Sequence, residues 1–294
     1  MAHDPYAEPD GGSQERLNGK QAVLLAFLLA ASASGAADSP GKVAVAFDQV
    51  APSVIRSRLE LVTQKLSARR TAIASLFEHV GCAADRLTEQ PVRGSKVPNV
   101  ICTLPGTGTG EIVVGGHYDL AERGMGAVDD WSGAVLLPSL YQSLESKPRR
   151  HRFVFVAFAA EEKGLVGSTS YVKQLSTDEK SAMRAMINLE CLGLTPPKIW
   201  ASRADPHLLT LYAQVANSLN LGVQGVNVDR VGDDDSHPFL SAGIPVLTIH
   251  SLTTETLPIL HSVRDNLKPI HDDYYYAAYR LAAAYLAFLD GALE

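Results

Sequence analysis

The sequence predicts a layered α/β fold around a largely parallel central sheet. Segments with strand character alternate along the chain with segments whose apolar residues recur at helical spacing. One strand segment, residues 152–159 (RFVFVAFA), is almost continuously apolar, which is typical of a strand buried on both faces at the centre of a sheet. The composition, with 46% hydrophobic and 20% charged residues, is that of an ordinary globular protein.

The expected elements follow in order along the chain. Apolar residues at helical spacing predict one helix over residues 52–80, which Pro52 would begin and Gly81 would end. The expected strands are residues 99–104, 111–116, 152–159, 185–189, 198–201 and 245–250. The further expected helices are residues 133–144, 206–219 and 270–289.

The glycine-rich segment 106–110, GTGTG, lies between the first two expected strands and invites comparison with phosphate-binding loops. It lacks the Lys-Ser/Thr ending of those loops, and it does not fit the G-x-G-x-x-G pattern of dinucleotide-binding loops. We therefore expect a hairpin turn at this position.

The charge balance argues against nucleic acid as a partner. The formal net charge is −6, whereas a protein that binds nucleic acid usually has clustered Lys and Arg residues. No internal repeat or long low-complexity tract divides the 294 residues. We expect a single catalytic domain over residues 38–294 and a separate segment before it.

Residues 1–37 carry the three parts of a secretory signal. Arg16 and Lys20 precede an apolar run at 22–31, and small residues follow at 32–37. The apolar run is shorter than the roughly 20 residues that a membrane-spanning helix needs.

We therefore expect an exported protein, periplasmic or secreted, whose mature chain begins between about Ser34 and Ser39. The acidic leader before Arg16 is unusual for a signal. Either the start codon is assigned too early, or the segment is an uncleaved anchor through residues 22–33, which would be the only expected contact with a membrane.

Residues able to bind a metal follow the expected strands at their carboxyl ends, where open α/β sheets place their ligands. They are His117 and Asp119, Glu161 and Glu162, Glu190, His250 and His261. Side chains two apart in a strand share a face, so His117 can bind a metal while Asp119 orients its imidazole. Of two adjacent glutamates, one can hold a metal while the other takes a proton from a metal-activated water.

Five motifs occur in a fixed order: GGHYD at 115–119, GAVDDWSG at 126–133, EEKGLVGS at 161–168, NLECLG at 188–193 and HSVRDN at 261–266. Together they closely resemble the secreted co-catalytic zinc aminopeptidases, relatives of the glutaminyl cyclases. The resemblance spans about residues 50–290. It implies a three-layer α/β/α sandwich with a mixed, mostly parallel sheet, two zinc ions, and peptide substrates with a free N-terminus.

The resemblance also implies a role for each site residue. Asp129 would bridge the two zinc ions, Glu161 would be the general base, and Asp119 would be the partner of His117. The implied metal ligands are His117, Asp129, Glu162, Glu190 and His261. The hydrolase motifs H-E-x-x-H and G-x-S-x-G are absent, which argues against a thermolysin-like site and a serine hydrolase.

Two departures keep alternatives open. The family usually has Asp where this chain has Glu190, so that one zinc ion is possible in place of two. Residues 234–239, DDSHPF, resemble the D-D-H-x-P-F segment of the glutaminyl cyclases, but Ser236 stands where those enzymes have His. The alternatives are a single-zinc glutaminyl-peptide cyclotransferase and a non-catalytic member of the fold.

Other histidines and cysteines have weaker assignments. His271 competes with His261 as a ligand, but His261 precedes the Asp265-Asn266 part of the motif and is preferred. Cys82 and Cys102 flank an expected hairpin, and in an oxidising compartment that spacing could close a disulfide.

Overall fold

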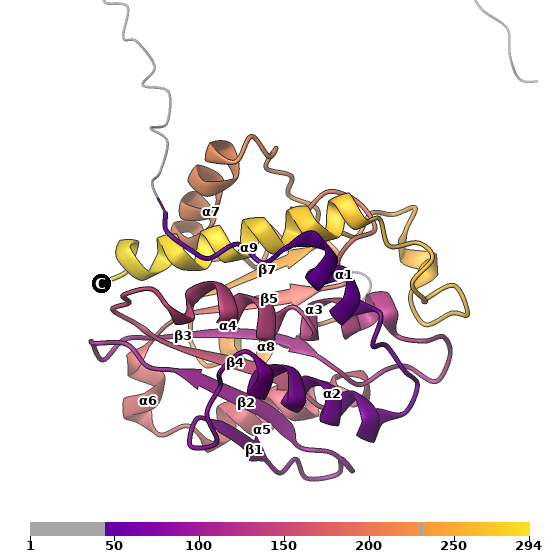
Figure 1. Ribbon diagram of the computed structural model, residues 1–294, viewed down its shortest axis with the longest axis horizontal. Helices are drawn as coiled ribbons and strands as arrows, with labels where there is room; N and C mark the ends of the chain where they lie inside the picture. Colours follow the sequence, from indigo (N-terminus) through magenta and orange to yellow (C-terminus); the bar gives the residue numbers. More distant parts are fainter. Residues whose placement is uncertain (1–44, 230–231) are drawn as a thin grey trace, which may run out of the picture. The chain divides into compact units, whose positions relative to one another are not determined.

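A computed structural model describes residues 45–229 and 232–294 (Figure 1). The predicted targeting segment 1–37 and its apolar stretch 22–33 lie outside the described residues. The described residues belong to one compact unit. Among the helices of the described ranges, none has both the length and the apolar character that crossing a membrane would need.

The described chain forms a mixed sheet of seven strands in the order β1-β2-β4-β3-β5-β7-β6. The strands β4, β3, β5 and β7 run parallel, whereas β1 and β2 at one edge and β6 at the other are paired antiparallel. The strands are β1 (Leu87–Gln90), β2 (Asn99–Leu104), β3 (Glu111–His117), β4 (Arg152–Phe158), β5 (Met183–Glu190), β6 (Lys198–Ile199) and β7 (Val246–His250).

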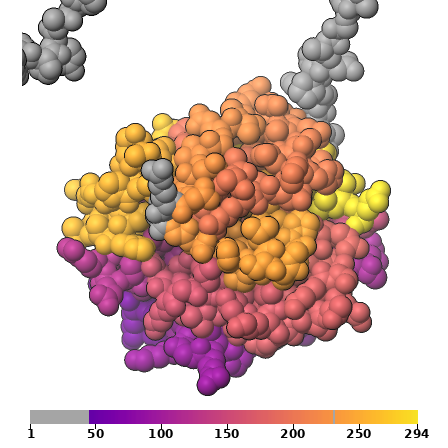
Figure 2. All heavy atoms as spheres, turned by 180° about the vertical axis from the view of Figure 1, so that it is seen from behind, coloured from indigo at the N-terminus to yellow at the C-terminus, as the bar shows by residue number. Residues whose placement is uncertain are grey.

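Helices cover both faces of this sheet, which confirms the predicted α/β/α sandwich (Figure 1). Their bounds are α1 (Pro52–Leu59), α2 (Leu66–His79), α3 (Ser132–Ala134), α4 (Leu137–Glu145), α5 (Val166–Gln174), α6 (Thr177–Ala182), α7 (Pro206–Ser218), α8 (His237–Ser241) and α9 (Asp272–Ala292). Figure 2 shows the molecule from behind, where the second half of the chain, coloured pink through orange to yellow, covers most of the visible face.

The alternation of side chains along the strands explains why two cores form. In β3, Val114 enters the larger core, to which α2, α4, α7 and α9 contribute, and Val113 enters the smaller core with α5 and α8. In β4, Phe155 points into the larger core and Val154 into the smaller one. Both faces of these strands are therefore buried, as the continuous apolar run of β4 predicts.

Residues 52–80 form two helices, so the prediction of one continuous helix is wrong. The chain leaves helical geometry between α1 and α2, and side chains bind carbonyls in this break. The indole Nε1 of Trp131 donates to Leu59 O at 3.0 Å, and Nε of Arg69 donates to Thr63 O at 2.6 Å. Helical spacing alone did not reveal this change of direction, because both helices keep apolar residues toward the core.

The predicted hairpin at 106–110 is also wrong, because β4 lies between β2 and β3 in the sheet. The glycine-rich loop instead packs on the segment that precedes β4: Thr107 N donates to Arg149 O and Gly108 N to Arg150 O. The hairpin expected between Cys82 and Cys102 is confirmed, because β1 pairs antiparallel with β2, although β1 was not among the expected strands. The order of the strands depends on β4, which is distant in the sequence, so the turn residues at 106–110 could not predict that β4 inserts between β2 and β3.

The predicted Cys82–Cys102 disulfide is confirmed. It ties the chain just after α2 to the middle of β2, and Cys191 is a free, buried cysteine.

Reduction of this disulfide should lower the free energy of unfolding by about 3 kcal/mol, because the bond closes a loop with a sequence separation of 20 and so restrains the unfolded chain. Urea unfolding with and without reductant measures the effect. The double variant Cys82→Ala/Cys102→Ala is the control, since reductant should leave its stability unchanged. Three free thiols in denatured, unreduced protein would contradict the bond.

Candidate metal centre

The predicted site residues come together at the carboxyl edge of the sheet. His117 ends β3 and Glu190 ends β5, and these two strands are neighbours. Glu161 and Glu162 follow β4 in a short 3-10 turn. Asp129 lies in the irregular helical turn before α3, and His261 lies in the loop after β7. Five separate chain segments therefore supply the cluster.

Two glycines allow the turn with Asp129 to approach the strands closely. A Cβ atom at Gly133 would lie 2.4 Å from Asp130 Oδ2 and 2.6 Å from Leu189 O. A Cβ atom at Gly116, in β3, would lie 3.0 Å from Ala134 N. A side chain at Gly133 would clash with these atoms, and one at Gly116 would force its neighbours to move by a few tenths of an ångström.

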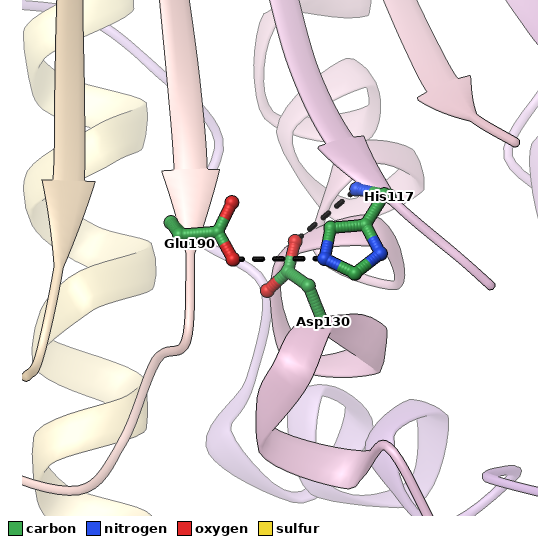
Figure 3. Close-up of side chains that lie close together, drawn as sticks. All are labelled: His117, Asp130 and Glu190. Atoms are coloured by element: carbon green, nitrogen blue, oxygen red, sulfur yellow. Dashed lines mark hydrogen bonds and ion pairs between the residues drawn. The ribbon is translucent and has the colours of Figure 1, made fainter. Parts of the chain in front are cut away.

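His117 is the centre of the first group of possible ligands. Its imidazole is fully buried, and Nε2 lies 3.1 Å from Asp129 Oδ1 and 3.6 Å from Glu190 Oε1. Figure 3 shows Glu190 at the tip of its strand facing the ring of His117. The longer side chain of Glu190, where the resembling family usually has Asp, thus reaches the group.

His261 is the centre of the second group. Its Nε2 lies 3.1 Å from Asp129 Oδ2 and 3.2 Å from Glu162 Oε2. The side chain of His261 is 61% exposed, whereas Asp129 and Glu162 are largely buried. Asp129 thus directs one carboxylate oxygen to each group, as a bridging carboxylate must.

Asp119 connects His117 to the two glutamates. One of its oxygens lies 3.4 Å from His117 Nδ1. The same carboxylate accepts hydrogen bonds from Glu161 N at 3.0 Å and Glu162 N at 3.2 Å. Asp119 therefore holds the start of the glutamate turn by hydrogen bonds and lies beside the imidazole Nδ1, which has no hydrogen-bond partner.

Asp130 is a structural acid that the sequence analysis did not single out. It follows Asp129 through a cis peptide bond. Its carboxylate accepts hydrogen bonds from the backbone N–H groups of His117, Gly133 and Cys191, at 3.2, 3.0 and 2.9 Å. Figure 3 shows Asp130 below His117, close enough to count as a ligand. Because two of these amides lie at the ends of β3 and β5, we assign Asp130 to the support of these two strands.

Arg69, from α2, is a second residue that the sequence analysis missed. Its guanidinium is fully buried and lies 5.3 Å from the centre of the Trp131 ring. All five N–H groups donate to backbone carbonyls, those of Thr63, Tyr118, Asp119, Met125 and Gly126. No sequence signal could reveal this role, because carbonyl acceptors are the same at every residue. Arg69 thereby holds both ends of the loop that joins β3 to the turn with Asp129.

The pKa shifts reveal an excess of negative charge. Burial alone would lower the pKa of His117, but the surrounding carboxylates, with Glu161 foremost, raise it well above its ordinary value. Burial raises the pKa of Glu162 to about 7, and the charge of Asp129 adds to this rise. A hydrogen bond with Asp129 raises the pKa of His261 to about 9. A divalent cation among these groups would relieve the repulsion between the carboxylates.

The donor set fits zinc. Imidazole nitrogens and carboxylate oxygens are ordinary zinc ligands, although other divalent metals accept them as well. Glu162 Oε1 is buried and has no hydrogen-bond partner, as expected of an oxygen that is free to bind a cation. The site thus defines the chain as a candidate metalloprotein with two adjacent ligand groups that share one carboxylate.

The remaining candidates from the sequence lie outside both groups. His250 is buried, its Nε2 is 3.0 Å from Val226 O, and burial lowers its pKa to about 4. His271 is exposed and packs against the ring of Tyr274. In the cyclase-like segment, His237 lies 3.4 Å from Asp233. Each of these histidines therefore has local contacts that account for its position without a metal ion.

The chain belongs to peptidase family M28, whose family model matches residues 99–286. Aminopeptidase YwaD of Bacillus subtilis is 28% identical over 170 residues, which are 54% of this chain and 36% of that protein. The chain therefore spans little more than a third of the length of this curated relative.

Solved structures share the fold. The LapA aminopeptidase of Legionella pneumophila superposes with a TM-score of 0.72 and 18% identity, over 83% of this chain and 71% of that one. The glutaminyl cyclase of an Acidobacteriales bacterium superposes with a TM-score of 0.69 and 19% identity, over 86% of this chain and all of that one (100%). At these identities the similarity concerns the fold alone.

Replacement of Arg69 by Met should lower the free energy of unfolding by at least about 3 kcal/mol, because five backbone carbonyls lose their donor and three of these hydrogen bonds are fully buried. Urea unfolding of the full chain measures this change. Arg70→Met is the matched control: Arg70 is the next residue of α2, is 39% exposed and pairs with Glu89, so its loss should change stability by less than about 1 kcal/mol. Equal losses for both variants would refute the role of Arg69.

Proposed function

We propose that this protein is a zinc-dependent aminopeptidase, which hydrolyses the bond after the N-terminal residue of a peptide. The observation that carries the proposal is the position of Asp129, whose two oxygens lie 3.1 Å from His117 and 3.1 Å from His261. A carboxylate shared by two histidine-containing groups suits a pair of metal ions that act together. Membership of peptidase family M28 supports this proposal.

The residues divide into two ligand sets. His117, Asp129 and Glu190 would hold one zinc ion, and Asp129, Glu162 and His261 would hold the other. When bound, zinc supplies Lewis acidity, which lowers the pKa of water and polarises a carbonyl group. The negative charge of the ligands offsets the charge of the ions, and burial of His117 and Asp129 keeps bulk water from competing for them.

Glu161 would act as the general base. Its side chain is 13% exposed, lines the cavity beside both ligand sets, and lies 3.7 Å from His117 Nε2. Its carboxylate would accept a proton from the attacking water and pass it to the amine that leaves. Asp119 would position this base indirectly, because it binds the backbone N–H of Glu161.

The charge of the cavity favours a substrate with a free amino terminus. Acidic side chains line it, and none of its described lining residues is Lys or Arg. A substrate ammonium group would be attracted to these carboxylates, whereas a C-terminal carboxylate would be repelled by them and would find no Lys or Arg to pair with. This balance favours removal of N-terminal over C-terminal residues.

A glutaminyl-peptide cyclotransferase is the second candidate, and the segment 234–239 is the observation that favours it. Asp235 in this segment is buried, and its pKa is raised to about 8, by burial first of all. His237, however, points to Asp233 rather than to either ligand set. Because Glu190 completes a second set of ligands, we place hydrolysis first.

The protein stripped of metal by a chelator should regain activity with two zinc ions per chain. Zinc titration followed by metal analysis and by hydrolysis of leucine p-nitroanilide tests this expectation. N-acetylation of the substrate should abolish cleavage, because it removes the ammonium group. A single zinc ion, with cyclisation of glutaminyl peptides and no hydrolysis, would replace our proposal with the cyclase function.

Replacement of Glu161 and replacement of Glu162 should affect different properties of the enzyme. Glu161→Gln should lower kcat by at least about 10²-fold and leave the zinc content unchanged, because it removes a base and no ligand. Glu162→Gln should lower the zinc content, because it removes a charged ligand. Glu78→Gln, on the exposed side of α2, is the control and should behave as wild type. Loss of zinc in Glu161→Gln, with zinc retained in Glu162→Gln, would reverse the assignment.

A further inference from the structure

Cys191 places a thiol at the metal centre. The chain has three cysteines, and Cys191 is the one outside the disulfide. Its Sγ lies 3.3 Å from Glu190 Oε1, the oxygen that also faces His117 Nε2 at 3.6 Å. Sγ, an oxygen of Glu190 and an oxygen of Asp129 all lie within 4.8 Å of one another. The thiol therefore lies among the ligands of the set formed by His117, Asp129 and Glu190, here called the first set, although it is not one of the five ligands that the resemblance implies.

The backbone of Cys191 is held on both sides of its side chain. Its N–H donates to Asp130 Oδ1 at 2.9 Å, and its carbonyl accepts a hydrogen bond from the hydroxyl of Ser251. Its φ is 50°, in the left-handed region that glycine adopts without steric cost. Glycine would form this turn with less strain, so the turn itself does not account for the cysteine side chain.

Neighbouring side chains leave the thiol facing ligand atoms. Asn188, two residues earlier on the same face of β5, donates from Nδ2 to Glu190 Oε2 at 3.2 Å. This contact leaves Oε1 of Glu190 to the thiol and to His117. The imidazole of His117 is fully buried, and its unpartnered Nδ1 shows that the ring has unfilled bonding capacity. Sulfur, oxygen and nitrogen thus meet beside a cavity of about 420 Å³, which Cys191 lines and through which a cation can reach them.

A sulfur ligand would give the first set a different chemistry from the second. Thiolate is an ordinary zinc ligand and favours soft cations, whereas carboxylate oxygens also suit hard cations such as Mg²⁺ and Mn²⁺. Four protein ligands fill the tetrahedral coordination of zinc, whereas three leave one position for water. The second set, formed by Asp129, Glu162 and His261, has only oxygen and nitrogen ligands.

We propose that Cys191 is the fourth protein ligand of the first set, and that its sulfur makes this set selective for zinc over manganese and magnesium. The inference rests on the ligand sets of the proposed function and adds one ligand to them. The first set is then closed, and the position that a water molecule can take belongs to the second set.

X-ray absorption at the zinc edge tests the added ligand on the full chain loaded with zinc. We expect a sulfur neighbour at about 2.3 Å, besides nitrogen and oxygen neighbours at about 2.0–2.2 Å. Cys191→Ser should lose the sulfur neighbour and keep the others. A wild-type spectrum without sulfur, or a sulfur neighbour that persists in Cys191→Ser, would overturn the inference.

Hydrolysis of leucine p-nitroanilide by the same samples separates the inference from the proposed function. Hydrolysis without a sulfur neighbour would overturn the inference alone. A sulfur neighbour in a zinc-loaded protein that cleaves no peptide would support the ligand and refute the aminopeptidase function.

Metal selectivity gives a second measurement. Cys191→Ser should lower the affinity for the more tightly bound Zn²⁺ ion by at least about 10-fold and leave the affinity for Mn²⁺ unchanged, because only the softer cation depends on sulfur. A thiol that merely donates a hydrogen bond to Glu190 would affect both cations alike, and that result would contradict the proposal. Ser181→Ala, at an exposed position of α6, is the control and should keep both affinities. Circular dichroism verifies folding, and if Cys191→Ser does not fold, Cys191→Ala replaces it while the wild-type spectrum still decides.

Discussion

The mutual repulsion of acids gathered at one edge of the sheet is the constraint on which the centre depends. Asp129, Glu161, Glu162 and Glu190 lie around only two histidines, and most of their surface is buried. Such carboxylates would move apart unless their backbone were held in place. The surrounding structure supplies that support mainly through acids and one arginine that bind backbone groups.

These supporting contacts join segments that are distant in the sequence. Asp119 ties β3 to the turn after β4, and Asp130 ties β3 to the end of β5. Asp265, from the loop after β7, accepts a hydrogen bond from Val128 N at 2.7 Å, beside Asp129. In each contact a carboxylate accepts hydrogen bonds from backbone N–H groups. These N–H groups belong to the sheet or to its turns, so the sheet itself fixes the position of the cluster.

Part of this arrangement could be predicted from residue patterns. The position of His117 and Asp119 followed from a strand that ends in glycines, since alternate residues share a face. The residue types alone could not show that Asp129 and Asp130 have different roles. Both are aspartates, and their carboxylates reach different partners only because the backbone directs them differently. The role of Arg69 could not be predicted, because it binds backbone carbonyls, which every residue carries. The order of β2, β4 and β3 could not be predicted either, because strand pairing depends on contacts between residues distant in the sequence.

The order of the ligands along the chain has a consequence for synthesis. His117 to Glu190 have left the ribosome well before His261, and Asp265 contacts a residue 137 positions earlier. The second ligand set is therefore closed only when the last quarter of the chain has joined the sheet. A nascent or prematurely terminated chain that ends before His261 would lack that set, and the second zinc ion of the proposed hydrolase could bind there only after this part of the chain is made.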